Sequence, residues 1–322
     1  MTGERAQLGW AAATPLDYLT SHGAKADAIR PLTIGTVAIS LAVIGIVALL
    51  LIVGLRRART APAPGSRLEV MRDEGGLSWL WIGVGLSSLV LLFSIVWTVA
   101  VLAEIASPSE KPALTVEITA RQWWWQVRYL NDDPSRIFAT ANEIHIPVGR
   151  PVRFKLVGGD VIHSFWVPGL GGKTDLIPGQ TNETWLEARE PGTYRGQCTE
   201  YCGLEHARMG LLVIAEPPAQ FEAWRAHQLR SAAPASGEGA FAMRCGACHA
   251  VRGTTAAGML GPDLSHFAQR RTLAAATLPN DGSHLESWLD DPQAIKPGNL
   301  MQKPELTGQE RATIVAYLES LT

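Results

Sequence analysis

Four side chains within the stretch CTEYCGLEHARM have the chemistry of metal ligands: Cys198, Cys202, His206 and Met209. Two thiolates, an imidazole and a thioether form a soft ligand set that suits copper. A mononuclear blue-copper site uses one cysteine and two histidines, so this stretch has one cysteine too many. Two thiolates four residues apart on a loop can instead bridge two copper ions, each capped by one imidazole. The second imidazole must then come from another part of the chain.

Two other interpretations of this stretch remain open from the ligand types alone. Tetrahedral zinc bound by two cysteines and two histidines is the chemical rival. A disulfide between Cys198 and Cys202 is the simplest alternative, and it gains weight if the segment lies outside the cytoplasm, where disulfides form.

The second cysteine pair lies in the sequence Cys245-Gly-Ala-Cys248-His249, which is the C-x-x-C-H signature of c-type haem attachment. This spacing lets both thiols add to the vinyl groups of one porphyrin, and the adjacent histidine reaches the iron. The segment GPDL at 261–264 resembles the turn of cytochromes c that offers a carbonyl to the other ring nitrogen of this histidine, and the resemblance implies that role toward His249. A thioredoxin-like pair needs a βαβ context that is absent here, and zinc needs more ligands than this region offers.

The sixth ligand of the iron is predicted to be Met301, in the sequence KPGNLMQKPEL. Met259 is too close to the attachment site, and Met243 lies within the attachment helix itself. His266 and His284 are the remaining candidates, and each is better explained as a surface residue.

Two long apolar runs near the N-terminus predict a membrane hairpin. Residues 32–55 and about 78–103 carry no charged side chain, and each is long enough to span a bilayer as a helix. Residues 1–30 contain no apolar run typical of a cleavable signal peptide. The formal net charge of -2 gives no indication of nucleic-acid binding.

The loop between the two runs is basic, and it contains Arg56, Arg57, Arg59, Arg67 and Arg72. Basic residues in short loops stay in the cytoplasm. The hairpin is therefore predicted to place both termini, and everything after about residue 108, on the extracytoplasmic side.

The rest of the chain divides by its hydrophobic pattern into three parts. Residues 113–215 contain short β-type runs punctuated by Pro and Gly, which is typical of an antiparallel sandwich or barrel. Residues 219–230 predict one amphipathic helix. A small polar linker at 231–236 leads to a helical region at 237–322, whose last helix begins with a capping box formed by Thr307 and Glu310.

The motifs of the β region resemble those of subunit II of haem-copper cytochrome c oxidases. They are RQWWWQVRY at 121–129, GGDVIHSFW at 158–166, GKTDLIPGQ at 172–180 and GTYRGQCTEYCGLEHARM at 192–209. The resemblance runs from the hairpin to about residue 230, with the motifs in the order of the family. The appended haem signature is similar to the caa3 type, in which a cytochrome c is fused to the C-terminus.

This resemblance implies a fold and a domain arrangement. It implies a multi-domain membrane protein with an N-terminal segment and two-helix hairpin at 1–110. A cupredoxin-like Greek-key domain, all β, follows at 111–230 with a short C-terminal helix. After the linker at 231–236, an all-α class I cytochrome c domain occupies 237–322.

The resemblance also implies the ligands of a dinuclear copper A centre. His163 is the missing imidazole, and the other ligands are Cys198, Cys202, His206, Met209 and the backbone carbonyl of Glu200. The side chain of Glu200 is implied to reach a magnesium ion shared with the catalytic subunit.

The resemblance suggests roles for other polar and aromatic residues less directly. Asp160 and Asp175 match acidic positions near the catalytic subunit. Trp123 matches a surface tryptophan that takes electrons from cytochrome c, with Trp124 as the rival and Trp125 expected in the core. Asp73 and Glu74 lie near a position where the family has a glutamate for proton uptake, but solvated loop charges explain them better.

The implied function is that of subunit II of a proton-translocating respiratory oxidase in a bacterial cell membrane. Electrons from a cytochrome c are expected to pass through the fused haem c and the copper pair to subunit I, which holds haem a, haem a3 and copper B; subunit III is a further expected partner. Oxygen is reduced in subunit I, not in this chain. The competing hypothesis is a membrane-anchored electron carrier that works without an oxidase.

Overall fold

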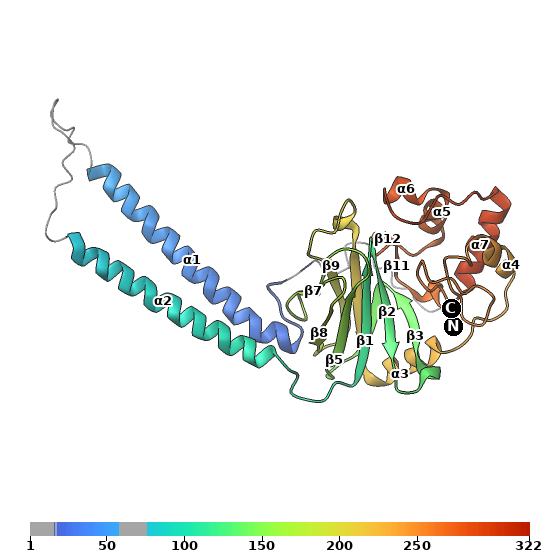
Figure 1. The fold of residues 1–322 in the computed structure, drawn as a ribbon, viewed down its shortest axis with the longest axis horizontal. Coiled ribbons are helices and arrows are strands. Elements are labelled where there is room, and N and C mark those ends of the chain that lie inside the picture. Colours follow the sequence, from blue (N-terminus) through green and yellow to red (C-terminus); the bar gives the residue numbers. More distant parts are fainter. Residues whose placement is uncertain (1–15, 17, 58–75) are drawn as a thin grey trace, which may run out of the picture. The chain divides into compact units, whose positions relative to one another are not determined.

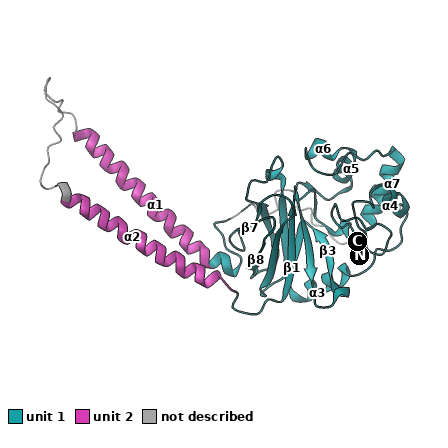
Figure 2. Ribbon diagram, in the orientation of Figure 1, with its two compact units in different colours: residues 1–27, 108–322 teal, residues 28–107 magenta. Residues whose placement is uncertain are grey.

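The structure is a computed structural model that describes residues 16, 18–57 and 76–322. The chain forms two compact units (Figure 2): one comprises the described residues up to Asp27 together with Pro108–Thr322, and the other is Ala28–Ser107. The predicted loop residues Arg59, Arg67, Arg72, Asp73 and Glu74 lie outside the described residues.

The smaller unit is built from two long apolar helices, α1 (Ala24–Arg57) and α2 (Gly76–Ile105) (Figure 1). Their most apolar windows have mean hydropathies of 3.0 and 2.4, and only 0% and 6% of those windows are buried. A helix that is apolar on all sides and exposed along its length matches a lipid environment better than water. Both predicted spans fall within these helices, and each helix is long enough to cross a bilayer.

The β region forms two five-stranded sheets. The first sheet contains, in spatial order, β3 (Phe138–Ala141), β2 (Trp124–Leu130), β1 (Leu114–Arg121), β5 (Val152–Gly158) and β8 (Thr181–Leu186). The second contains β4 (Glu143–Pro147), β10 (Gly210–Glu216), β9 (Gly192–Cys198), β6 (His163–Trp166) and β7 (Thr174–Leu176). The pairs β1–β5 and β4–β10 are parallel, and the other pairs are antiparallel.

Alternation along the strands creates the core between the sheets. In β1 the buried side chains are Val116, Ile118 and Ala120, which is the period of two that a half-buried strand requires. Trp125 is fully buried in β2, as predicted for a core aromatic. The predicted all-β sandwich is therefore confirmed, and its core also contains the sulfur-bearing side chains of Cys198, Cys202 and Met209.

The predicted amphipathic helix is α3 (Pro218–Gln228), which packs against the sandwich. Phe221 is buried, and the ring of Trp224 stacks on the imidazole of His145 with 4.1 Å between centroids. The helix thereby covers one end of the core.

The helical region contains four short helices and a small two-stranded sheet. These are α4 (Glu238–Arg244), α5 (Gly282–Asp290), α6 (Pro292–Ile295), α7 (Gly308–Ser320), β11 (Thr272–Leu273) and β12 (Leu278–Pro279). Its separate core includes Phe241 of α4, Leu285 of α5 and Tyr317 of α7. The predicted helical character is confirmed, but the sheet was not predicted, and α4 ends at Arg244, just before the first haem-signature cysteine.

The capping box at the start of α7 yields a prediction about local stability. The hydroxyl oxygen of Thr307 accepts a hydrogen bond from the Glu310 amide at 3.2 Å, and the Glu310 carboxylate accepts one from the Thr307 amide at 2.9 Å. Replacing Thr307 by Ala should lower the free energy of local opening by about 1 kcal/mol. Hydrogen exchange of the first-turn amides in the full chain should then be faster by about fivefold.

Thr313 offers a matched control for this prediction. Its hydroxyl donates to the carbonyl of Gln309 within the same helix at 2.8 Å, so it caps nothing. Thr313→Ala should leave exchange in the first turn unchanged, and equal acceleration by both substitutions would contradict the capping role of Thr307.

Candidate functional site

The first group of predicted ligands lies on the connection between β9 and β10. β9 ends at Cys198, a single 3-10 turn covers His206–Arg208, and β10 begins at Gly210, directly after Met209. β6 begins at His163 and pairs with β9, with Phe165 opposite Cys198. The sheet register therefore brings His163 beside a loop that lies 35 residues further along the chain.

The side chains of this loop converge at distances that suit shared metal ions. The Sγ atoms of Cys198 and Cys202 are 3.7 Å apart, and both cysteines are free. Nδ1 of His163 is 3.8 Å from Cys198 Sγ, and Nδ1 of His206 is 3.5 Å from Cys202 Sγ. Met209 Sδ lies 3.9 Å from Cys202 Sγ.

These distances distinguish a metal centre from a disulfide. A disulfide holds its sulfurs about 2.05 Å apart, far less than the separation of Cys198 and Cys202. Two ligands of one ion, each a little over 2 Å from it, lie about 3.5–4 Å apart. The backbone carbonyl of Glu200 is also 3.3 Å from Cys198 Sγ. The residues present therefore fit the copper pair, with each thiol facing one imidazole.

Hydrogen bonding shifts the pKa values of the two buried thiols in opposite directions. Cys198 and Cys202 are 1% and 2% exposed, and the side chain of His163 is fully buried. The pKa of Cys198 is lowered to about 4 because the Cys202 thiol and the His163 ring stabilise its thiolate against the cost of burial. The same pairing raises the pKa of Cys202.

Asp160 holds His163 in the required orientation. Its Oδ1 atom lies 2.8 Å from Nε2 of His163, which leaves Nδ1 facing the thiols. A carboxylate on the far nitrogen fixes the tautomer and strengthens the ring as a ligand. Asp160 also accepts hydrogen bonds from the amides of Gln122 and Val161. Asp160 was predicted to lie near a subunit interface, and its contact with His163 was not predicted.

Trp123 is bonded directly to the ligand loop. Its indole N–H donates to the carbonyl of Cys202 at 3.0 Å, and the Gln122 side chain donates to the same carbonyl at 2.7 Å. Gly203 follows with a φ of +116°, and a Cβ there would lie 3.1 Å from the Trp123 ring, so only glycine fits this turn. Trp123 is itself only 7% exposed. Gln122 was missed, because nothing in its sequence neighbourhood marks it as a partner of the loop.

The predicted magnesium-binding side chain lies outside the buried cluster. The Glu200 carboxylate is about half exposed and lies 3.9 Å from Nζ of Lys173, which is also 3.9 Å from Asp175. Glu200 and Asp175 thus share one lysine at the surface.

The haem-signature residues follow α4 directly. The amides of Cys248 and His249 both donate to the carbonyl of Cys245 at 3.0 Å, which folds the three residues into a tight turn. Both cysteines are free, and Cys248 is exposed. Nδ1 of His249 is 2.8 Å from the carbonyl of Pro262, so the segment GPDL supplies the predicted partner and Nε2 remains available for iron.

Apolar side chains around this turn are exposed in a way that fits a porphyrin. Met243, Met259 and Leu260 are each more than 70% exposed. Exposed large apolar side chains beside an attachment signature are the surface that a bound haem would cover. The residues present therefore fit covalent haem c.

Met301, the predicted sixth ligand, lies in the segment between α6 and α7. It is partly buried against the core of the helical region, and its backbone is held by Asn299 Oδ1 at 2.8 Å and Gln293 Nε2 at 2.9 Å. His266 binds the carbonyl of Thr322 at 3.0 Å, and His284 binds Asp281 at 2.8 Å. Both histidines thus serve structural contacts, and the prediction of a surface position is wrong for His266, which is only 5% exposed.

Substitution of Met301 tests this ligand. A methionine ligand opposite histidine raises the reduction potential of a c-type haem. Met301→Ala should therefore lower the potential measured by redox titration, by on the order of 0.1 V. The control is Gln302→Ala, at the exposed neighbouring position, which should leave the potential unchanged. A shift of equal size in the control, or none in Met301→Ala, would refute the ligand.

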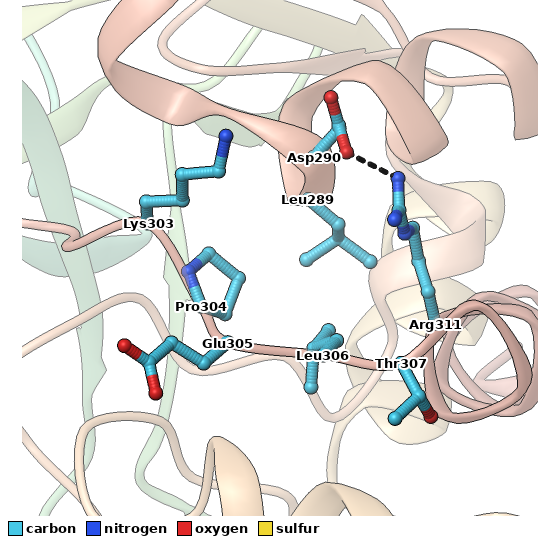
Figure 3. Close-up of a pocket in the computed structure, with 8 residues that line it drawn as sticks. All are labelled: Leu289, Asp290, Lys303, Pro304, Glu305, Leu306, Thr307 and Arg311. Carbon is cyan, nitrogen blue, oxygen red and sulfur yellow. Dashed lines mark hydrogen bonds and ion pairs between the residues drawn. The ribbon is translucent and has the colours of Figure 1, made fainter.

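A surface hollow of about 550 Å³ lies between the end of α5 and the segment leading into α7 (Figure 3). It is lined by Leu289, Asp290, Lys303, Pro304, Glu305, Leu306, Thr307 and Arg311. Asp290 and Arg311 form an ion pair across one side, drawn as a dashed line in Figure 3. None of the predicted ligands lines this hollow, so it belongs to neither candidate centre.

Comparisons with known proteins agree with this division of the chain. Residues 114–216 match the family described as "Cytochrome C oxidase subunit II, periplasmic domain", and residues 234–322 match "Cytochrome c". Cytochrome c oxidase subunit 2 of Alkalihalophilus pseudofirmus is 39% identical over 214 residues, which cover 64% of this chain and 60% of that protein. The protein of the same name from Bacillus sp. (strain PS3) is 31% identical over 255 residues, covering 72% of this chain and 70% of the relative.

Among solved structures, the periplasmic domain of subunit II of cytochrome oxidase from Bradyrhizobium japonicum is 32% identical, with a TM-score of 0.35. The match covers 38% of this chain and 96% of that one. A membrane-anchored β-sandwich with a thiolate–imidazole cluster and an appended C-x-x-C-H domain is consistent with a haem-copper oxidase subunit. The chain belongs to the cytochrome c oxidase subunit 2 family and carries a cytochrome c domain of the kind found in fused, caa3-type subunits.

Proposed function

We propose that this chain takes electrons from a cytochrome c and passes them to the oxygen-reducing subunit of a proton-translocating oxidase. The observation that carries the proposal is the convergence of Cys198, Cys202, His163 and His206 within one buried cluster. Bound to this chain, a copper pair and a haem c would each supply a one-electron redox centre.

The copper pair is assigned to side chains that a rigid scaffold holds in place. The proposed ligands are His163, Cys198, Cys202, His206, Met209 and the carbonyl of Glu200. Strands β9 and β10 of the second sheet fix the two ends of the loop, and Asp160 fixes the ring of His163. A site whose ligands are held before metal binding needs little rearrangement when its charge changes.

The haem is assigned to Cys245 and Cys248 as attachment points, with His249 and Met301 as axial ligands. The carbonyl of Pro262 orients His249 so that its free nitrogen can bind iron. Magnesium is proposed between the Glu200 side chain and the catalytic subunit. Its support is limited to the exposed carboxylate and the resemblance of this position to the family.

Trp123 is proposed to lie on the route by which electrons reach the copper centre. Its support is the hydrogen bond from its indole to the carbonyl of a proposed ligand, Cys202. Trp124, the rival on the opposite face, is paired with Arg121 in the sheet.

The proposed setting is a bacterial cell membrane, with the hairpin in the bilayer and both soluble domains outside the cytoplasm. We place the domain boundaries at 1–110, 111–230 and 237–322, with the linker at 231–236. The proposed partners are subunit I with haem a, haem a3 and copper B, subunit III, and a cytochrome c donor. Oxygen reduction is assigned to subunit I.

Isolation of the native complex tests this function against a carrier that works without an oxidase. The chain should co-purify with a large multi-span subunit bearing haem a, and the complex should consume oxygen when supplied with reduced cytochrome c. Recovery of the chain in gentle detergent without any multi-span haem protein would contradict the proposal.

A further inference from the structure

A buried lysine joins the helical region to the β region. Lys296, which follows α6, is only 2% exposed. Its Nζ atom donates to the carbonyls of Trp123 at 2.7 Å, Arg208 at 2.7 Å and Ala274 at 3.1 Å. Trp123 and Arg208 belong to the β region, and Ala274 belongs to the helical region. An ammonium group has three N–H donors, and three carbonyls accept them here.

Burying the ammonium group of Lys296 costs free energy, which favours a specific role for this residue. Burial lowers the pKa of Lys296 to about 7, and the buried carboxylate of Glu205 acts in the opposite direction. Buried charges seldom add net stability compared with apolar groups of the same size, but they can fix one geometry among several. All three acceptors are needed to compensate the charged group, because an unpaired buried donor is strongly unfavourable.

The chain around Lys296 covers Trp123 and the ligand loop. The carbonyl of Ile295 accepts a hydrogen bond from Arg208 at 2.7 Å. A Cβ at Gly298 would lie 3.6 Å from both the Trp123 ring and Leu204, so this residue sits directly against the indole. The helical region lies over Trp123 and contributes to its burial. A separate cytochrome c could pass electrons directly to Trp123 only if the indole were exposed.

A strained turn reaches the same loop from the helical region. Ala274, Ala275 and Ala276 have φ values of 55°, 60° and 54°. This left-handed conformation is unfavourable for residues that carry a Cβ atom. The carbonyl of Ala275 accepts from the amide of Gly210 at 3.1 Å, next to Met209. Strain of this kind persists where surrounding contacts impose it, and here the Ala275 carbonyl bonds the β region while the Ala274 carbonyl accepts from Lys296.

A second buried charge anchors the two regions at another point. Glu143 of β4 is 2% exposed. Its Oε1 accepts from the amides of Arg271 and Thr272, both at 2.8 Å, and from the Thr272 hydroxyl at 3.1 Å. An anchor at β4 and another at Trp123 restrict rotation of one region against the other, as a flexible linker alone would not.

We infer that Lys296 is a positioning residue that fixes the helical region over Trp123 and the loop Cys198–Met209. In this arrangement Trp123 faces the chain's own haem-binding region, and an outside donor reaches only that region. The docking of the helical region on the β region rests on the contacts alone. The consequence for electron transfer rests on the proposed function.

Lys296→Met in the full chain, within the native complex, tests the inference. Methionine retains much of the length of the side chain but donates no hydrogen bond. Exchange of the amides of Gly210 and Thr272 should accelerate at least about tenfold, because both donate across the interface. Electron transfer from reduced haem to oxidised copper, followed after flash reduction, should slow by at least about tenfold while both absorption spectra stay unchanged. Lys303→Met, which removes an exposed lysine of the same region, should change neither rate.

The remaining outcomes also decide the question. Unchanged exchange at Gly210 and Thr272 would overturn the inference, whatever the metal content of the chain. Fast exchange throughout β1 together with loss of both spectra would overturn it too, because Lys296 would then support folding in general. If Lys296→Met does not accumulate, Lys296→Gln keeps two donors and should give a smaller local acceleration; exchange equal to wild type would again overturn the inference. Failure of the proposed function would remove the metal spectra from the wild type, but would leave the exchange result interpretable.

Discussion

Substitution of Cys202 by serine is expected to abolish the copper centre while leaving haem c in place. Cys202 Sγ lies within 4 Å of three other proposed ligand atoms: Sγ of Cys198, Nδ1 of His206 and Sδ of Met209. A serine hydroxyl is a hard ligand that is not ionised at neutral pH, so it cannot replace a bridging thiolate. Even the loss of a supporting contact costs about 10–100-fold in metal affinity, and loss of this ligand should exceed that range.

Three measurements check this result. The copper content of the purified complex should fall by two ions per chain, with copper B of subunit I retained, and the near-infrared absorption of the copper pair should disappear. Oxygen consumption with reduced cytochrome c should fall by more than about 100-fold. Tyr201→Phe, at a 76% exposed position of the same loop, is the control and should retain copper. A Cys202→Ser complex with full copper and activity would exclude the thiolate bridge.

The second large effect is expected from replacing Cys245 and Cys248 together by serine. Both thiols are free and border the tight turn that presents His249. Without thioether bonds the haem is held only by its axial ligands and packing. Haem staining after denaturing electrophoresis should therefore be lost, while copper remains. Oxygen consumption with reduced cytochrome c should drop by more than about 100-fold, because the haem that would accept electrons from the donor is missing.

The same substitution should weaken the helical region. Its core is small, and a bound group that binds only the folded state adds to stability. Faster hydrogen exchange in α4 and α7 is the expected sign. His284→Gln, in an exposed side chain paired with Asp281, should retain haem and serve as the control. Full haem staining in the double-serine protein would show that attachment occurs elsewhere.

Local chemistry was predictable because it depends on residue type and spacing. Residues close in sequence form each of the predicted features: the two thiol pairs, the contact of His249 with the Pro262 carbonyl, and the capping box of α7. The hairpin was predictable for a similar reason, since a run of apolar residues of bilayer length has few other uses. Alternation in β1 likewise indicated which face is buried.

Contacts between distant segments were not predictable from the same patterns. The bond from the Gln122 side chain to the Cys202 carbonyl spans 80 residues. The contact between Asp160 and His163 joins residues only three apart, but it depends on how the chain turns before β6. Lys296 had no signal, because a lysine in a Pro-Gly segment is usually a solvated residue. The left-handed turn at Ala274–Ala276 contradicts the local preference of alanine, and a contact with the β region supports it, since the Ala275 carbonyl accepts from the amide of Gly210.

Metal analysis of the gently purified wild-type complex tests the central claim most directly. The amount of chain is measured by amino-acid analysis. The copper of other subunits is subtracted by comparison with Cys202→Ser, and their iron by comparison with the double-serine protein. This chain should then account for two coppers and one iron. Zinc in place of copper, or cysteines 198 and 202 recovered as a disulfide with no copper bound, would contradict the account.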